Sequence, residues 1–212
     1  MSLKPLFITF EGPDGSGKST ISKLFYEYLI NNNTQAIWTR EPGGNQIKIS
    51  EEIRNIVLNS DNKNITPKTE MLLFAASRSQ HVDELIRPYL EKGYYVICDR
   101  YIHSSLAYQG WGRNLGIKEV YKLNKYATDN LMPDIVFFIN VPYEMGLKRI
   151  TDGNRDMNRL DKESHEQHKK IYDGYLNVMK KIKSNYIIID GTKSKEEVLN
   201  EVIEKFNKYK GK

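Results

Sequence analysis

One glycine-rich loop and its flanking segments constrain the fold of this 212-residue chain most. The stretch "EGPDGSGKST" (11–20) separates Gly12 from Gly17-Lys18-Ser19 by four residues, the spacing of a phosphate-binding P-loop. The apolar run "LFITFEG" (6–12) precedes the loop, and residues 17–32 follow it with apolar side chains at helical spacing. A strand, this loop and a helix in that order predict a nucleotide-binding α/β fold.

Four further apolar runs predict strands: "QAIWTR" (35–40), "YYVICDR" (94–100), "IVFFINV" (135–141) and "YIIID" (186–190). Helical patterns lie between them. Residues 46–59 place Ile49, Ile53, Ile56 and Val57 on one face, and Thr66-Pro67 begins another helix. Strands that are apolar along their whole length predict a parallel sheet with helices on both faces. We therefore expect one α/β domain, residues 1–212, around a five-stranded parallel sheet.

Composition narrows the possible partners. The net charge is +5, but the lysines alternate with glutamates, as in "KSKEEVLNEVIEKFNKYKGK", which is typical of a solvated helix face. No segment approaches the ~20 apolar residues of a membrane span. No secretion signal is evident at the N-terminus, and the single cysteine, Cys98, fits a buried thiol in a reducing compartment. We expect a cytoplasmic protein that binds neither nucleic acid nor membranes.

The loop itself predicts a site for Mg²⁺ and ATP. Backbone N–H groups at a helix N-terminus hold phosphate oxygens, and Lys18 would reach the β- and γ-phosphates. The Ser19 hydroxyl and Asp99, which ends an apolar strand, are the expected metal-associated oxygens. The loop residues expected at ATP are Gly12, Pro13, Asp14, Gly15, Ser16, Gly17, Lys18, Ser19 and Thr20.

Three classes of P-loop protein compete at this point. A GTPase needs Asn-Lys-x-Asp, and the nearest match, "NKYA" (124–127), lacks the aspartate and lies in a helical segment. A nucleic-acid-dependent ATPase would carry a basic stripe with aromatic residues, which the chain does not show. A small nucleotide kinase needs a second phosphate pocket that faces the first. Several arginine-bearing segments near strand ends could build one.

Those segments are "TREPGG" (39–44), "EIR" (52–54), "LLFAASR" (72–78) and "DRYIHSSLAYQG" (99–110). In this order they resemble the thymidylate kinase family, its bacterial members above all, and the resemblance covers essentially the whole chain. It implies a P-loop nucleoside monophosphate kinase fold with strand order 2-3-1-4-5, usually as a homodimer. The implied reaction is Mg²⁺-dependent transfer from ATP to dTMP, giving dTDP for dTTP synthesis and DNA replication. A kinase of another nucleoside monophosphate remains the main alternative, followed by a P-loop ATPase or GTPase module.

The resemblance also implies roles for individual residues at dTMP. Phe74 would stack on thymine, with Arg78 donating to the base O4 and Pro42 beside the 5-methyl group. Asp14 would accept from the sugar 3′-OH, and Tyr108 would fill the space of a ribose 2′-OH. The polar edge of the base would be read by Ser104, Ser105 and Gln109. The acceptor phosphate would lie near Arg40, Arg54, Arg100 and Glu41.

The remaining positive charge is the open question, because Lys18 is the only basic residue of the loop. Some members of the family carry an arginine at the position of Gly15. Because this chain has glycine at that position, the irregular segment "TDGNRDMNRLD" (151–161) is expected to form a mobile lid that supplies the cations Arg155 and Arg159. The other residues expected to act in catalysis are Lys18, Arg100, Asp14 and Glu41. The alternative is that these lid arginines are merely solvated. Arg149 and Lys193, the latter in the turn "DGTKS" (190–194), would flank adenine, and His165 and His168 are expected at the surface.

Overall fold

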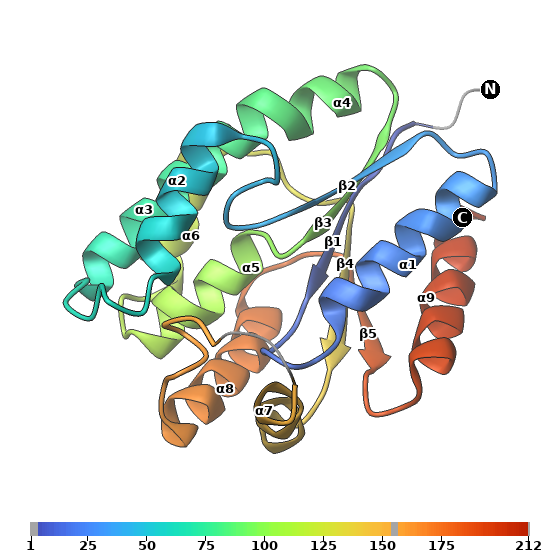
Figure 1. The fold of residues 1–212 in the computed structure, drawn as a ribbon. Helices are drawn as coiled ribbons and strands as arrows, with labels where there is room; N and C mark the ends of the chain where they lie inside the picture. Colours follow the sequence, from blue (N-terminus) through green and yellow to red (C-terminus); the bar gives the residue numbers. More distant parts are fainter. Residues whose placement is uncertain (1–3, 154–156, 212) are drawn as a thin grey trace.

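Five parallel strands lie side by side in the order β2-β3-β1-β4-β5 in a computed structural model that describes residues 4–153 and 157–211 (Figure 1). This confirms the expected fold class and strand order. The strands are β1 (Phe7–Glu11), β2 (Ala36–Arg40), β3 (Tyr95–Asp99), β4 (Ile135–Asn140) and β5 (Tyr186–Asp190).

Helices connect the strands and cover both faces of the sheet (Figure 1). Two helical runs include π-helical segments, η1 within the run from α3 to α4 and η2 directly after α5. The Thr66 side chain caps α3 and Pro67 occupies its first turn, as the sequence predicts. The helices are α1 (Lys18–Asn31), α2 (Lys48–Leu58), α3 (Pro67–His81), η1 (Val82–Ile86), α4 (Arg87–Glu91), α5 (Ile102–Ser105), η2 (Leu106–Gly112), α6 (Ile117–Ala127), α7 (Tyr143–Thr151), α8 (His165–Lys181) and α9 (Lys195–Lys210).

Alternate side chains of each strand enter different parts of the core. Ile8 and Phe10 of β1 pack with Phe137 of β4 against α1 and α9, whereas Phe7 faces the layer that contains Val82 of η1. Both layers are apolar, as burial of a parallel sheet on both faces requires. The lone thiol of Cys98 is buried on the second face, as expected.

One predicted helix face is wrong. Ile49 and Ile56 of α2 are 51% and 47% exposed, whereas Val57 is buried. The helix packs against α3 through Ser50, whose hydroxyl donates to the Ser77 carbonyl at 2.8 Å. The apolar face of α2 is therefore split between the core and the surface. Across the described ranges, no helix is long and apolar enough to cross a membrane.

The carboxyl ends of β1, β2 and β3 meet at one edge of the sheet. Backbone pairing places Arg40 beside Asp99 and Phe10 beside Asp99. Each strand there runs into a segment that the sequence marks as functional: the P-loop, "EPGG" and "DRY". This edge is where parallel α/β sheets bind their ligands.

Candidate active site

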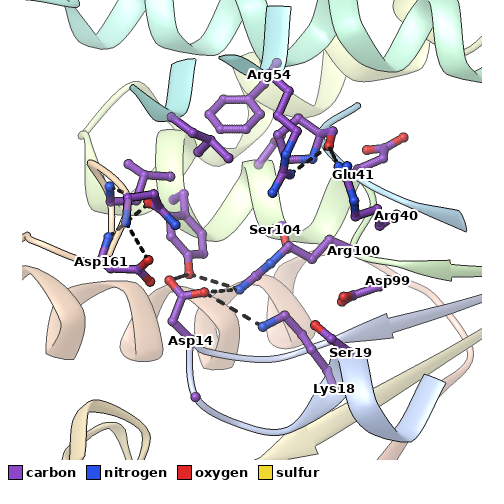
Figure 2. A pocket seen from close by; sticks show the side chains of 18 of the residues that line it. Asp14, Lys18, Ser19, Arg40, Glu41, Arg54, Asp99, Arg100, Ser104 and Asp161 are labelled. Carbon is purple, nitrogen blue, oxygen red and sulfur yellow. Dashed lines mark hydrogen bonds and ion pairs between the residues drawn. The ribbon is translucent and has the colours of Figure 1, made fainter. Parts of the chain in front are cut away.

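A cavity of about 520 Å³ opens at this edge and joins the P-loop to the arginine-bearing segments (Figure 2). It brings together all the residues expected at dTMP, together with Glu41, Asp99 and Arg149. Four expected ATP residues do not line it: Gly12, Pro13, Ser16 and Lys193. Four lining residues were not predicted: Leu58, Asn158, Leu160 and Asp161.

The P-loop presents Lys18 at the base of this cavity. Its Nζ donates to the Pro13 carbonyl at 3.2 Å and lies 3.8 Å from Asp14 Oδ1. Burial, and then the charge of Arg100, lower the pKa of Lys18 to about 8. Lys18 is thus mostly protonated at neutral pH and can meet an anion. Gly15 adds no side chain, and its backbone packs against that of Gly146 in α7.

Arg100 lies at the centre of the cavity (Figure 2). Its guanidinium forms an ion pair with Asp14 and donates at 2.9 Å both to Ser104 Oγ and to the Tyr175 hydroxyl. Its φ of +74° is uncommon for arginine and turns the chain sharply after β3. The side chain is therefore fixed on both its backbone and its charged ends.

Asp14 is the counter-charge to these cations. Burial by itself would raise the pKa of Asp14, but the charges of Arg100 and Lys18 outweigh it and hold that pKa well below its usual range. The Tyr108 hydroxyl also donates to Asp14 Oδ2, at 2.6 Å. The carboxylate is thus ionised and points toward the cavity, where it can accept from a hydroxyl group.

Another carboxylate, the fully buried Glu11, ends β1 directly before the P-loop. It accepts from the Tyr101 N–H at 2.8 Å and from Ser104 Oγ at 2.6 Å. Burial raises the pKa of Glu11 to about 7, against the opposing hydrogen bond from Ser104. This group links the turn after β3 to the end of β1.

The expected metal-associated oxygens are both available. Asp99 and Ser19 line the cavity close to Lys18 (Figure 2). Asp99 Oδ1 is buried, and no residue of the described ranges forms a hydrogen bond with it. A buried carboxylate oxygen without a donor beside a serine hydroxyl fits a hard cation such as Mg²⁺.

A different donor cluster, Glu41, His81 and Cys98, also has its ligand atoms within 4.8 Å of one another. Its groups are already engaged. His81 contacts Glu41 Oε1 at 3.1 Å with Nδ1 and Thr39 Oγ1 at 2.8 Å with Nε2. We interpret this cluster as a buried hydrogen-bond network that holds the loop after β2.

The arginines expected at the acceptor phosphate differ in how they are held. Arg40 forms a two-pronged pair with Glu51, with both distances 3.0 Å. Arg54 donates to the Pro42 carbonyl at 2.8 Å and forms no ion pair with a described residue. Burial, and then nearby Arg40, lower the pKa of Arg54 to about 10, which leaves it charged at neutral pH. Arg54 is therefore a cation with spare donors at the cavity wall.

Arg78 and Phe74 share one face of α3 and both line the cavity. Arg78 Nε donates to Glu41 Oε2 at 2.6 Å, and its other nitrogens donate to Ser105 Oγ, Asn124 Oδ1 and the Tyr101 carbonyl. Four of the five guanidinium N–H groups are thereby used. Glu41, expected at the acceptor phosphate, lines the cavity and places its carboxylate oxygens on Arg78 and His81.

The lid residues lie only partly where the sequence places them. Arg155 is outside the described residues. Arg159 does not line the cavity; its Nη2 donates to Glu70 Oε2 at 2.6 Å and its Nε to the Val57 carbonyl at 2.9 Å. Leu160 is buried beside Phe74 in the same apolar cluster. The described end of this segment is therefore packed against α2 and α3, and Arg159 is not a solvated charge.

The two residues expected at adenine, Arg149 and Lys193, lie in different surroundings. Both outer nitrogens of Arg149 donate to the Gly191 carbonyl at 3.2 Å, which joins α7 to the turn after β5. Lys193 is paired with Glu201 at 3.0 Å and is 44% exposed. Arg149 is thus at the cavity, whereas Lys193 points to solvent in this arrangement.

Several buried polar residues of the site were missed from sequence. Glu70, His81 and Tyr175 each hold a lining residue in place but carry no motif. His81 could have been found, because it lies on the face of α3 that carries Arg78. The prediction for His168 is wrong: its side chain is buried, with Nε2 3.4 Å from the Asp161 carbonyl.

Comparison with known proteins agrees with this geometry. The sequence model of the family described as "Thymidylate kinase" matches residues 10–202. The chain is 47% identical to the thymidylate kinase of Clostridium novyi over 200 residues, which cover 94% of this chain and 97% of that protein. It is 48% identical to that of Finegoldia magna over 199 residues, 94% and 96% of the two chains. The counterpart in Lactobacillus acidophilus is 45% identical over 203 residues, 95% and 93% of the two chains.

Proposed function

The chain belongs to the thymidylate kinase family, and from this premise we propose that it transfers the γ-phosphoryl group of ATP to dTMP, giving dTDP and ADP. The observation that carries this proposal is one continuous cavity that has a P-loop at one end and Phe74, Arg78 and Gln109 at the other. Between the two ends lie Arg54 and Arg100, which suit the phosphate of the acceptor. The dTDP formed would supply dTTP synthesis.

The chemistry required is positioning and neutralisation of charge. An oxygen of the dTMP phosphate forms a bond to the γ-phosphorus, and the bond from that phosphorus to the β–γ bridging oxygen breaks. The acceptor oxygen is already ionised, so no strong base is needed. Lys18 and the P-loop amides would hold the ATP phosphates while Arg54 and Arg100 hold the acceptor. Mg²⁺, held by Ser19 and Asp99, would neutralise charge on the β- and γ-phosphates.

At the nucleoside end of the cavity, different residues would contact the base, its methyl group and the sugar of dTMP. Phe74 would stack on the base, with Arg78 and Gln109 at its polar edge and Pro42 at its methyl group. Asp14 would accept from the 3′-OH, where it is already held by Tyr108. The ring of Tyr108 would exclude a ribose 2′-OH by its bulk.

Residues 151–161 would act as a lid that brings Arg155 or Arg159 to the transferred group. Arg159 would have to exchange its contact with Glu70 for the phosphate. The support for a lid cation is that position 15 of the P-loop offers no basic side chain. Arginines that act in this way stabilise the charge that develops in the transition state.

The proposed assembly is a cytoplasmic homodimer. Helices α2 and α3 pack against each other (Figure 1), and Ile49 and Ile56 of α2 and Leu72 of α3 are each about half exposed. Large apolar side chains that stay exposed on neighbouring helices suit a protein interface. Sedimentation equilibrium of the wild type and of Ile56→Glu tests this: a dimer that the variant shifts to monomer supports it, and a monomeric wild type excludes it.

The function is tested by initial rates of ADP release with Mg-ATP and each of dTMP, dUMP, UMP, CMP, GMP and AMP. We expect dTMP to be used well and UMP poorly. Tyr108→Ala should admit UMP, whereas Tyr108→Phe should keep the discrimination. Comparable efficiency with UMP and dTMP in the wild type would assign the chain to a different acceptor.

A further inference from the structure

Glu70 is a buried carboxylate that the proposed function leaves without a task. It lies on α3 one helical turn before Phe74, is 1% exposed and does not line the cavity. Its oxygens accept from Gln109 Nε2 at 2.8 Å, from Arg113 Nε and Nη2 at 3.2 Å each, and from Arg159 Nη2 at 2.6 Å. One carboxylate therefore joins η2, α3 and the end of the lid segment.

The charge state of Glu70 follows from these contacts. Burial by itself would raise the pKa of Glu70, but the ion pair with Arg113 and the hydrogen bonds from Arg113, Gln109 and Arg159 outweigh it, so that this pKa is lowered. Arg113 is held from its other side by Glu163, at 2.6 Å. Glu70 is consequently an ionised, immobilised group that can only accept hydrogen bonds.

An acceptor-only neighbour decides which way a glutamine amide points. The amide of Gln109 has one donor end and one acceptor end, and only the donor end can face an ionised carboxylate. Nε2 must therefore turn toward Glu70, which leaves Oε1 for the cavity that Gln109 lines. Oε1 accepts no hydrogen bond from a residue that the structure describes.

We propose that Glu70 is a positioning residue that fixes the Gln109 amide with its carbonyl toward the pyrimidine, and so selects thymine over cytosine. This inference rests on the proposed function. Thymine carries a hydrogen on N3 and an acceptor oxygen at C4, which match Oε1 of Gln109 and a donor of Arg78. Cytosine offers a bare N3 and an amino group, so both contacts would become repulsive. Sites built on such hydrogen bonds reject the mismatched base strongly.

The test compares kcat/KM for dTMP and for dCMP in the wild type and in Glu70→Gln. The neutral amide can pair with either end of Gln109, so the orientation is no longer enforced. We expect the dTMP-to-dCMP ratio to fall by roughly tenfold or more, with KM for dTMP changing more than kcat. Glu163→Gln is the matched control: it removes the other carboxylate charge that pairs with Arg113 but forms no hydrogen bond with Gln109, and its ratio should equal that of the wild type.

A double variant that exchanges the two residues, Glu70→Gln with Gln109→Glu, shows whether Glu70 acts by orienting the Gln109 side chain or only by supporting the fold. The carboxylate at position 109 presents acceptors in either orientation, so it again offers one to N3–H. We expect the ratio to recover toward the wild-type value. Because the exchange keeps the charge and size of the pair, it also carries the test if Glu70→Gln alone does not fold.

Two outcomes overturn the proposal: a folded Glu70→Gln with the wild-type ratio, or a folded exchange variant whose ratio stays roughly tenfold or more below that of the wild type. Thermal melting establishes that each variant is folded. A wild type that does not phosphorylate dTMP would instead remove the proposed function, and this inference with it. The wild-type rates therefore distinguish the two failures.

Discussion

Gly15 of the P-loop and Gly146 of α7 lie backbone against backbone. A Cβ placed on Gly15 would overlap with the carbonyl oxygen of Gly146, and one placed on Gly146 would overlap with that of Asp14. Gly15 also has a φ of +74°, where side chains are strained. Position 15 therefore has no room for an arginine side chain, so under the proposed function any arginine that meets the transferred group would come from another segment.

This contact predicts a large cost for the smallest side chain. Gly15→Ala should lower the free energy of unfolding by the left-handed strain of about 1–2 kcal/mol and by a further overlap with α7. Gly93→Ala is the matched control, because Gly93 has a φ of +86° and open space around its Cβ position. Urea unfolding of the two variants without ligand measures the difference. Equal losses would mean that α7 yields easily at this point.

Arg100→Ala should affect acceptor binding and stability together. Losing a charge-assisted contact of ~1.5–3 kcal/mol predicts at least a roughly tenfold rise in KM for dTMP, while KM for ATP changes little. The partly buried Asp14 also loses its main partner, so unfolding should become easier. Arg87→Ala, which removes an exposed pair with Asp129, is the control and should leave both KM values unchanged. A collapse of ATP affinity with dTMP affinity intact would place Arg100 on the donor side.

The lid arginines are tested by Arg155→Ala, Arg159→Ala and the double variant. If one of them meets the γ-phosphoryl group, kcat should fall by roughly 10³–10⁵ while both KM values change far less. Arg159→Ala alone would have little effect on kcat if its guanidinium stays on Glu70 during turnover. Lys162→Ala removes an exposed cation close in sequence and serves as the control. Near-normal kcat in the double variant would exclude the lid as the source of charge.

Glu11 predicts a pH-dependent stability. Its pKa is raised to about 7 in the folded protein, chiefly by burial, from an ordinary value of 4.5. Between these two pH values the folded state retains a proton that the unfolded state releases, so stability falls as pH rises, on the order of 3 kcal/mol in total. Below about pH 4.5 and above about pH 7 this contribution is constant.

The measurement is the free energy of unfolding of wild type and Glu11→Gln between pH 4 and 8. The advantage of the wild type over Glu11→Gln should shrink across the window from 4.5 to 7. Glu27→Gln, an exposed position on α1, should follow the wild-type curve throughout. Parallel curves for wild type and Glu11→Gln would show that the carboxyl group titrates alike in both states.

Local patterns were enough for the P-loop and the five strands, because each depends on residues close together in sequence. The residues expected at dTMP came from the resemblance to a known family, and four further residues that line the cavity were not predicted. The Glu70 network was not predictable in this way, since its partners Gln109, Arg113 and Arg159 lie 39, 43 and 89 positions away. Only the folded chain brings these charges together, and no spacing rule marks them.

Two errors had different causes. The apolar face of α2 was misassigned because the helix packs through Ser50 and Val57, which leaves Ile49 and Ile56 at the edge of the packed face and exposed. The burial of His168 carried a signal that was overlooked: it lies three and seven positions before Ile171 and Tyr175, which share the buried face of α8. Its polar neighbours in "HEQH" hid that periodicity.

The division of the cavity between two sets of elements has a consequence for inhibition. The end formed by Phe74, Arg78 and Gln109 comes from α3 and η2 and owes no side chain to the P-loop. A compound confined to this end would compete with dTMP while leaving Lys18 and Ser19 to ATP. Under the proposed function, cellular ATP would not compete with such a compound.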